Sequence, residues 1–305
     1  MDSTVAERNA QVRRCVKLVF IYILFVMVLS NIADALLPKF GRMICALLGT
    51  LWAVKRSGCA PEKVTLLQDT NKMTGTGFVV VLGAFMAAKL LSLLPSALLA
   101  KLLVNEENAA ALQGLSKVED TPLLSFLDLG IITAICEETV FRGCVGNTFR
   151  RYGIRFAMIM STLLFSLYHC NILQLVSTFL PGIVLFYVAM NYSLKWSVLL
   201  HFINNGVLAI CFSLLKKASP DAFFANYGEY VIELLLIIAA VCLLKKDCAA
   251  EKVRIFLSAP QNEEGVYRAT MGNGWFVLVV LAMVIVSCML LMMLSGGLPA
   301  LPDMA

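Results

Sequence analysis

Charged residues are scarce in this 305-residue sequence: Asp, Glu, Lys and Arg make up 15% of it, whereas hydrophobic residues make up 60%. The mean hydropathy is +0.83, more apolar than the surface of a soluble protein tolerates. This scarcity excludes a water-soluble enzyme or binding domain. The net charge is +5, but the basic residues are dispersed between apolar runs, so we expect no nucleic-acid partner.

Paired-cysteine and soluble zinc-protease motifs are also absent. The ten cysteines include no C-x-x-C pair, and most lie in or beside apolar segments, where free cysteine behaves as a small hydrophobe. We therefore expect neither a disulfide framework nor a cysteine-based zinc site. The chain lacks H-E-x-x-H, so any zinc site would differ from that of soluble metalloproteases.

Long apolar runs are what the sequence has instead. A helix needs about 20 apolar residues to cross the roughly 30 Å hydrocarbon layer, so the chain is predicted to be an all-α, polytopic transmembrane helical bundle of eight or nine spans. The first run is too long for a signal peptide and is expected to be an uncleaved span. The runs cover residues 16–37, 43–54, 77–104, 122–145, 155–171, 172–192, 197–215, 230–244 and 275–297.

The distribution of basic residues predicts the orientation, because Lys and Arg collect on the cytoplasmic side. With nine spans and the N-terminus inside, eighteen loop Lys and Arg lie inside and six outside. If the short run at 43–54 does not cross, the count becomes eight inside to sixteen outside. We therefore expect nine spans and a cytoplasmic N-terminus.

Two adjacent carboxylates, Glu137 and Glu138, interrupt the run at 122–145. An ionisable group inside a span is costly unless it is paired or hydrated. Glu138 and Arg142 are four residues apart with the acid first, the favourable order for a helical ion pair. Glu137 is turned by roughly 100° from Glu138 and stays available to take a proton from water. An ordinary salt-bridge network is the alternative.

Both histidines of the chain, His169 and His201, also fall in apolar segments. One such histidine is usually a core residue, but two beside an available glutamate indicate chemistry. His201 shares a helix face with Asn205, and Phe165 shares one with His169. A base, two imidazoles and an amide that can donate to an oxyanion or ligate a metal are the groups that a hydrolytic site needs. This candidate site consists of Glu137, His169, His201 and Asn205.

Counting residues from the membrane surface gives expected depths. With Arg142 at the inner interface, Glu137 lies roughly 7–8 Å below it. His201 lies roughly 9 Å beyond Lys195, which agrees. Counted from Arg155, however, His169 lies roughly 21 Å deep, which does not agree with the other two.

In this order, Glu137-Glu138-x-x-x-Arg142, Phe165-x-x-x-His169 and His201-x-x-x-Asn205 resemble the three motifs of the CPBP intramembrane proteases. That family includes the type II CAAX prenyl endopeptidases and bacterial Abi proteins associated with bacteriocin immunity. The resemblance covers roughly residues 122–215, and the Phe141-Arg142-Gly143 ending looks more like the bacterial members.

The resemblance implies hydrolysis of a peptide bond in or at the membrane, with Glu137 activating a water. In a metal-dependent version, His169 and His201, with Glu137 or Asn205, hold a zinc ion that activates the water. In a metal-free version, Glu137 and His169 position the water, while His201 and Asn205 stabilise the oxyanion. The balance of donors slightly favours zinc on His169, His201 and Glu137, with Glu138, Arg142 and Phe165 in support.

Two other functions stay open on the sequence alone. Membrane carboxylates and histidines also form proton relays in transporters, although no repeat typical of transporters is found. A catalytically idle scaffold with the protease fold is the third possibility.

The sequence thus predicts three regions: residues 1–121 with about three spans, a catalytic core at 122–215 of about four helices, and residues 216–305 with two spans. The stretches 55–76, 105–121 and 245–274 are expected to be loops. We expect an integral protein of a bacterial cell membrane, with membrane lipid and a membrane-associated or lipidated peptide or protein as partners.

Overall fold

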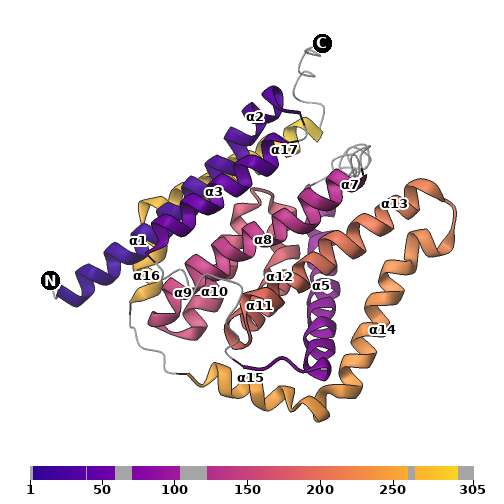
Figure 1. The fold of residues 1–305 in the computed structure, drawn as a ribbon. Coiled ribbons are helices and arrows are strands. Elements are labelled where there is room, and N and C mark those ends of the chain that lie inside the picture. The colour runs from indigo at the N-terminus through magenta and orange to yellow at the C-terminus, as the bar shows by residue number, and fades with distance from the viewer. Residues whose placement is uncertain (1–2, 39, 59–70, 104–121, 260–264, 295–305) are drawn as a thin grey trace.

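The computed structural model describes residues 3–38, 40–58, 71–103, 122–259 and 265–294, and all regular structure in these ranges is helical. The predicted all-α bundle is therefore confirmed (Figure 1). The stretch 105–121 and Cys59 lie outside the described residues. The other nine cysteines form no disulfide with one another.

An N-terminal hairpin forms one side of the molecule (Figure 1). Its first helix continues from α1 (Ser3–Ile23) through the π-helical segment η1 (Leu24–Leu29) into α2 (Ser30–Leu36). The second helix, α3 (Gly41–Ser57), packs against all three segments. At the other end of the chain, α16 (Val266–Met271) and α17 (Gly274–Leu294) pack against α1.

Two glycines show that α3 runs antiparallel along most of the first helix. A Cβ on Gly41 would lie 2.3 Å from the backbone of Ala33, and one on Gly58 would lie 4.0 Å from Arg14. The short apolar run at 43–54 therefore belongs to a helix that returns beside the first span.

The region at 122–215, which the sequence predicts to be catalytic, begins with one long helix that carries both glutamates. Two of its segments, η2 and η3, have π-helical hydrogen bonding, which is frequent at functional sites. The parts of this helix are α7 (Pro122–Ser125), η2 (Phe126–Ile132), α8 (Thr133–Glu138), η3 (Thr139–Gly146), α9 (Asn147–Phe149) and the 3₁₀ turn η4 (Arg150–Tyr152).

Three more helices complete this region. They are α10 (Ile154–Tyr168), α11 (Ile172–Asn191) and a helix built from α12 (Leu194–Phe202), η5 (Ile203–Ala209) and α13 (Ile210–Ala218). The backbone of Asn171 is extended and its side chain accepts a hydrogen bond from the Leu173 amide, which caps α11. The region thus contains the four helices that the sequence predicts.

On the opposite side from the hairpin, α5 (Gly75–Leu103) packs against both α11 and α14 (Phe223–Asp247). Lys89 on α5 joins this contact through ion pairs of 2.6 Å to Glu229 and to Glu233, the latter fully buried. A lysine inside an apolar helix is thereby neutralised at a helix–helix contact.

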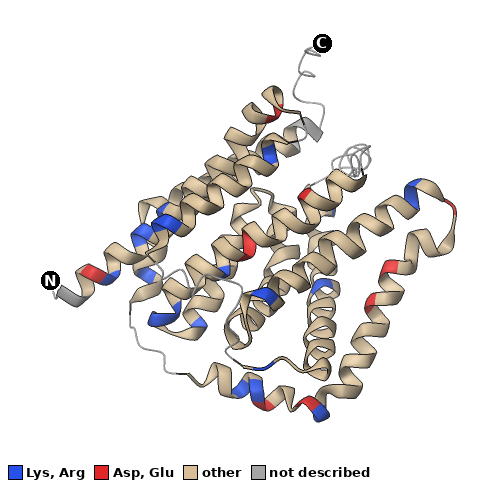
Figure 2. Cartoon of the chain, viewed as in Figure 1, with Lys and Arg blue, Asp and Glu red and all other residues tan. Residues whose placement is uncertain are grey.

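Five described helices are long and apolar enough to cross a membrane, which identifies an integral membrane protein. They cover Val5–Leu36, Gly75–Leu103, Ile172–Asn191, Leu194–Ala218 and Phe223–Asp247. Of the other predicted runs, 155–171 and 275–297 correspond to shorter apolar helices, Ile154–Tyr168 and Gly274–Leu290. The run at 122–145 carries the charged residues of the candidate site. In Figure 2, uncharged stretches separate the charged residues along most of the helices.

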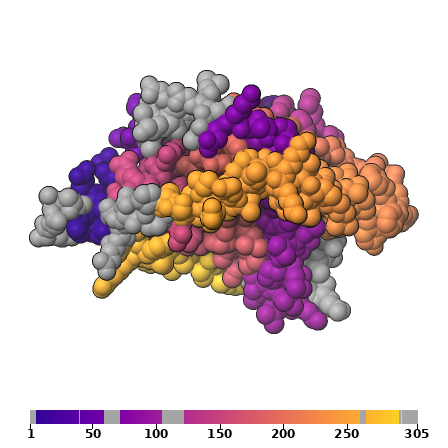
Figure 3. Space-filling view, turned by 90° about the horizontal axis from the view of Figure 1, so that it is seen from below, coloured from indigo at the N-terminus to yellow at the C-terminus, as the bar shows by residue number. Residues whose placement is uncertain are grey.

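The prediction of a loop at 245–274 is wrong in part. This stretch contains α16 and a further helix, α15 (Ala249–Leu257), which is visible in Figure 3. In α15, Phe256 packs edge-on against Tyr187 of α11 with ring centroids 5.0 Å apart, and Lys252 pairs with Asp247 at 2.7 Å. The sequence analysis missed α15 because nine residues cannot span a bilayer.

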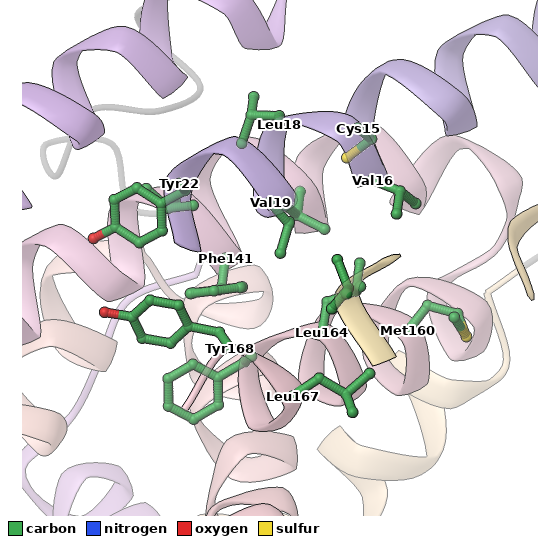
Figure 4. Packing of buried hydrophobic residues seen from close by; sticks show 14 of the residues in the cluster. Cys15, Val16, Leu18, Val19, Tyr22, Phe141, Met160, Leu164, Leu167 and Tyr168 are labelled. Atoms are coloured by element: carbon green, nitrogen blue, oxygen red, sulfur yellow. The ribbon is translucent and has the colours of Figure 1, made fainter. Parts of the chain in front are cut away.

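The main core lies between the hairpin and the helices of residues 122–215 (Figure 4). Tyr22 of α1 stacks on Tyr168 of α10 with ring centroids 5.4 Å apart, and Phe141 of η3 lies edge-on to Tyr22 at 6.2 Å. These buried rings join three helices directly beside the candidate site.

The helices that carry the glutamates and His201 touch backbone to backbone. A Cβ on Gly130 of η2 would lie 2.8 Å from the Cα of Gly206 in η5, and a Cβ on Gly206 would lie 3.2 Å from the Cα of Gly130. Only glycine fits this crossing without moving a helix.

We therefore predict that Gly130→Leu destabilises the fold by about 1–3 kcal/mol through overpacking. Thermal unfolding of purified protein in detergent measures the effect. Gly75→Leu is the control, because it adds the same side chain at a helix start where a Cβ would have nothing within 4 Å. Equal unfolding temperatures for the two variants would contradict the close crossing.

Candidate active site

One cavity of about 500 Å³ is lined by all four residues of the predicted site: Glu137, His169, His201 and Asn205. They come from α8, the C-terminal end of α10, α12 and η5. Glu137 is 5% exposed and His201 is 6% exposed. Residues separated by as many as 68 positions in the sequence thus meet at one water-accessible space.

The supporting ion pair lies directly behind this cavity. Arg142 Nη1 donates to Glu138 Oε1 at 3.0 Å, and both side chains are fully buried. The second guanidinium nitrogen, Nη2, donates to the carbonyl oxygen of Gly182 on α11 at 3.1 Å. The guanidinium also lies 4.2 Å from the ring centroid of Phe165, a favourable cation–π contact. The spacing-based pairing of Glu138 with Arg142 is therefore observed.

Glu138 has two further partners that the sequence analysis did not foresee. Ser197 Oγ donates to Glu138 Oε2 at 2.5 Å, and His201 Nδ1 lies 2.9 Å from Glu138 Oε1. An ionised carboxylate only accepts hydrogen bonds, so His201 Nδ1 carries the hydrogen. Glu138 therefore fixes the tautomer and orientation of His201 and directs its Nε2 atom away from this pair.

A chain of amides continues from His201. Asn204 Nδ2 donates to Asn205 Oδ1 at 2.8 Å, which turns the Asn205 Nδ2 group toward His201 Nε2 at 3.1 Å. In this arrangement the neutral imidazole accepts at Nε2, and the second N–H of Asn205 stays available. Asn204 and Asn205 both line the cavity.

Glu137 lies outside the ion pair. Its Oε2 atom is 3.8 Å from His201 Nε2, beyond direct hydrogen-bond distance. Both atoms belong to residues that line the cavity. The two adjacent glutamates therefore occupy different environments: Glu138 is enclosed by donors, whereas Glu137 faces the space that a substrate can enter.

His169 follows the last residue of α10. Its Nδ1 atom is 2.9 Å from the carbonyl oxygen of Phe165, so Nδ1 donates and Nε2 keeps its lone pair. The Phe165 ring lies edge-on to both imidazoles, with centroid distances of 4.9 Å to His169 and 6.2 Å to His201. Phe165 thus contacts the buried arginine and both histidines.

The structure corrects the depth argument. Arg142 is fully buried and does not mark the interface, because its helix continues to exposed Arg150. Counted from Arg150, Glu137 lies roughly 20 Å along the helix, which matches the roughly 21 Å for His169 counted from Arg155. Arg142 therefore gives no reference level for depth, and the expected depths of Glu137, His169 and His201 stay predictions.

Sequence reasoning missed Ser197 and Gly182 as partners of the ion pair. Ser197 could have been found, because it lies four residues before His201 on the same helix face. Gly182 contributes only a backbone carbonyl, which no side-chain pattern reveals. Asp128 does not line the cavity, but it pairs with Arg42, which does.

In the described residues, no three His, Cys, Asp or Glu side chains are grouped closely enough to hold a metal ion. Glu137, His169 and His201 are donor types that zinc takes, and they share the cavity, but their present positions do not form a three-ligand group. Zinc stays a prediction of the sequence.

We predict that Glu138→Gln sharply lowers the yield of folded protein, because it leaves Arg142 buried without a counter-charge. Removing one partner of a buried ion pair costs about 3–5 kcal/mol. Size-exclusion yield and thermal unfolding in detergent measure this loss. Glu137→Gln is the matched control at the adjacent position and is expected to fold normally. Loss of fold in the control alone would reverse the roles of the two glutamates.

A family model matches the part of the chain that contains the candidate site. Residues 119–207 match the family model described as type II CAAX prenyl endopeptidase Rce1-like. The match includes all three motifs, the last of which consists of His201 and Asn205. It ends eight residues before the predicted boundary at 215, and more than half of the chain lies outside it. No curated protein and no solved structure matches the chain. Residues 119–207 are therefore similar to type II CAAX prenyl endopeptidases of the Rce1-like kind.

Proposed function

We propose that the chain is an intramembrane endopeptidase that uses Glu137 to activate a water against a peptide bond of a membrane-associated, prenylated protein. The observation that carries the proposal is the cavity in which Glu137, two imidazoles and Asn205 meet. The family match supports peptide-bond hydrolysis and the CAAX class of substrate.

The division of work between the glutamates supports the mechanism. Glu138 accepts from Arg142, Ser197 and His201, so its carboxylate is occupied by donors. Glu137 has no contact of this kind with Arg142 and faces the cavity. Glu137 is therefore the group that takes a proton from water as the water oxygen attacks the carbonyl carbon. It then returns this proton to the leaving amine nitrogen.

The remaining groups position the water and stabilise the oxyanion. With Nδ1 bonded to Phe165, His169 offers Nε2 as an acceptor for the second hydrogen of the water. Asn205 keeps one amide hydrogen for the developing oxyanion. His201 is held at Nδ1 by the Glu138 carboxylate at 2.9 Å. Its Nε2 atom accepts from Asn205 at 3.1 Å and so orients the amide that donates to the oxyanion.

The mechanism takes no step through a metal. Zinc would supply a Lewis acid and an activated water, and His169, His201 and Glu137 would have to move into a three-ligand group to hold it. The steps above need only the residues in the positions that they occupy.

We predict that Glu137→Gln lowers hydrolysis of a fluorogenic prenylated CAAX peptide by about 10²–10⁴-fold, because it removes the base and keeps the shape. Turnover is measured with purified full-length protein in nanodiscs. Glu251→Gln, an exposed acid on α15, is the control and should retain full rate. If the Glu137 variant hydrolyses normally, the chain has another base or is an idle scaffold.

The zinc prediction is tested with His201→Gln. In the mechanism proposed here, this variant loses roughly 100- to 1000-fold in rate, because the oxyanion donor Asn205 loses the imidazole that orients it. The wild-type protein should also retain activity after chelation. A loss of wild-type activity that chelator causes and added zinc reverses, together with loss of bound metal in His201→Gln, would replace this mechanism by the zinc version.

A further inference from the structure

A second cavity, of about 660 Å³, lies between α1 and α3, outside the candidate active site. Four cationic side chains line it: Arg14 and Lys17 from α1, and Lys55 and Arg56 from the last turn of α3. All four are exposed. Charged residues of α1 are visible at this N-terminal side in Figure 2.

No carboxylate neutralises these four cations within the described residues. No described acidic residue lines the cavity, and the described ion pairs involve other basic residues. An adjoining cavity of about 1000 Å³ shares Arg14 and Lys17, adds Arg13 and Arg268, and has no acid among its described lining residues. The fold thus collects positive charge around a concave surface, and no acid in the described part of the chain compensates it.

The floor of the 660 Å³ cavity is apolar. Leu18, Ile21 and Trp52 line it beside the cations. Farther along the same two helices, the surface becomes strongly apolar, with Leu24 39% exposed and Leu51 67% exposed. A ligand with an anionic head and a hydrocarbon tail would match both parts.

The position of the cavity along the helices fits a membrane interface. Trp52 lies in its wall, and Trp275 accepts a cation–π contact from Lys17 at 5.1 Å. Tryptophan is enriched where hydrocarbon meets headgroups. Basic clusters at this level attract anionic lipids. A free phosphate would use the cations and leave the apolar floor uncovered.

We propose that this cavity, lined by Arg14, Lys17, Lys55 and Arg56, binds the phosphodiester headgroup of an anionic phospholipid. The acyl chains then lie over Leu18 and Ile21 and along the exposed leucines. The site is separate from Glu137 and its partners, so the proposal does not depend on the proposed hydrolytic function.

Tryptophan quenching tests this proposal. Trp196→Phe and Trp275→Phe leave Trp52 as the one tryptophan of the chain, and brominated acyl chains quench it only when they lie close. Nanodiscs of phosphatidylcholine receive increasing fractions of brominated phosphatidylglycerol or, in parallel, brominated phosphatidylcholine. We expect half-maximal quenching at a roughly tenfold lower fraction of the anionic lipid.

Paired variants identify the cations responsible. Lys55→Gln with Arg56→Gln should remove the preference for the anionic lipid, and Arg14→Gln should reduce it from the other helix. Lys245→Gln with Lys246→Gln is the matched control, because these are also exposed cations in the last turn of an apolar helix. The control should leave the preference intact.

Three results would overturn the proposal. The first is equal quenching by the two brominated lipids. The second is a preference that Lys55→Gln with Arg56→Gln leaves unchanged. The third is loss of the preference when inorganic phosphate is added at constant ionic strength, because the site would then take free phosphate and not a lipid headgroup.

Discussion

The buried ion pair between Glu138 and Arg142 is the constraint on which the candidate site depends. Both side chains are fully enclosed, and two charges removed from water are stable only when their geometry and remaining hydrogen bonds are good. The surrounding helices supply these contacts through Gly182 of α11, Ser197 and His201 of α12, and the ring of Phe165 on α10. The contacts that stabilise the two buried charges are therefore the same contacts that fix the geometry of the candidate site.

Because Glu137 and Glu138 are adjacent in one helix, their side chains point into different environments. A rotation of about 100° per residue directs Glu138 toward Arg142 and Glu137 toward the cavity. Glu138 orders the imidazole of His201, whose Nε2 atom lies 3.8 Å from Glu137 Oε2. Because Glu138 acts on His201 through Nδ1, it is a positioning residue, while Glu137 and the Nε2 side of His201 belong to the space where a substrate can bind.

Much of this could be predicted from the sequence. The apolar runs predict the helices because a bilayer enforces helical hydrogen bonding inside each segment. The i,i+4 spacings predict the pairs Glu138–Arg142 and His201–Asn205, because neighbours on a helix face meet whatever the tertiary fold is. Both pairs are present in the structure.

What the sequence did not predict depends on contacts between helices. The His201–Glu138 hydrogen bond joins residues 63 positions apart, and the carbonyl of Gly182 has no side-chain signature. Arg142 was placed at the interface because an arginine in a membrane segment usually marks a helix end, whereas here its charge is neutralised in the interior. The short helix α15 was missed because a search for spans overlooks helices that cover other elements.

The contact between Gly130 and Gly206 has a mechanical consequence. Side chains at a helix crossing can change rotamer and let the helices drift apart or together, but two backbones in contact have no such freedom. The spacing between the helix of Glu137 and the helix of His201 is therefore set by atomic radii at one point. When bilayer thickness or lateral pressure changes, the two helices can tilt about this point as a pivot, so the residues nearest to it are displaced least.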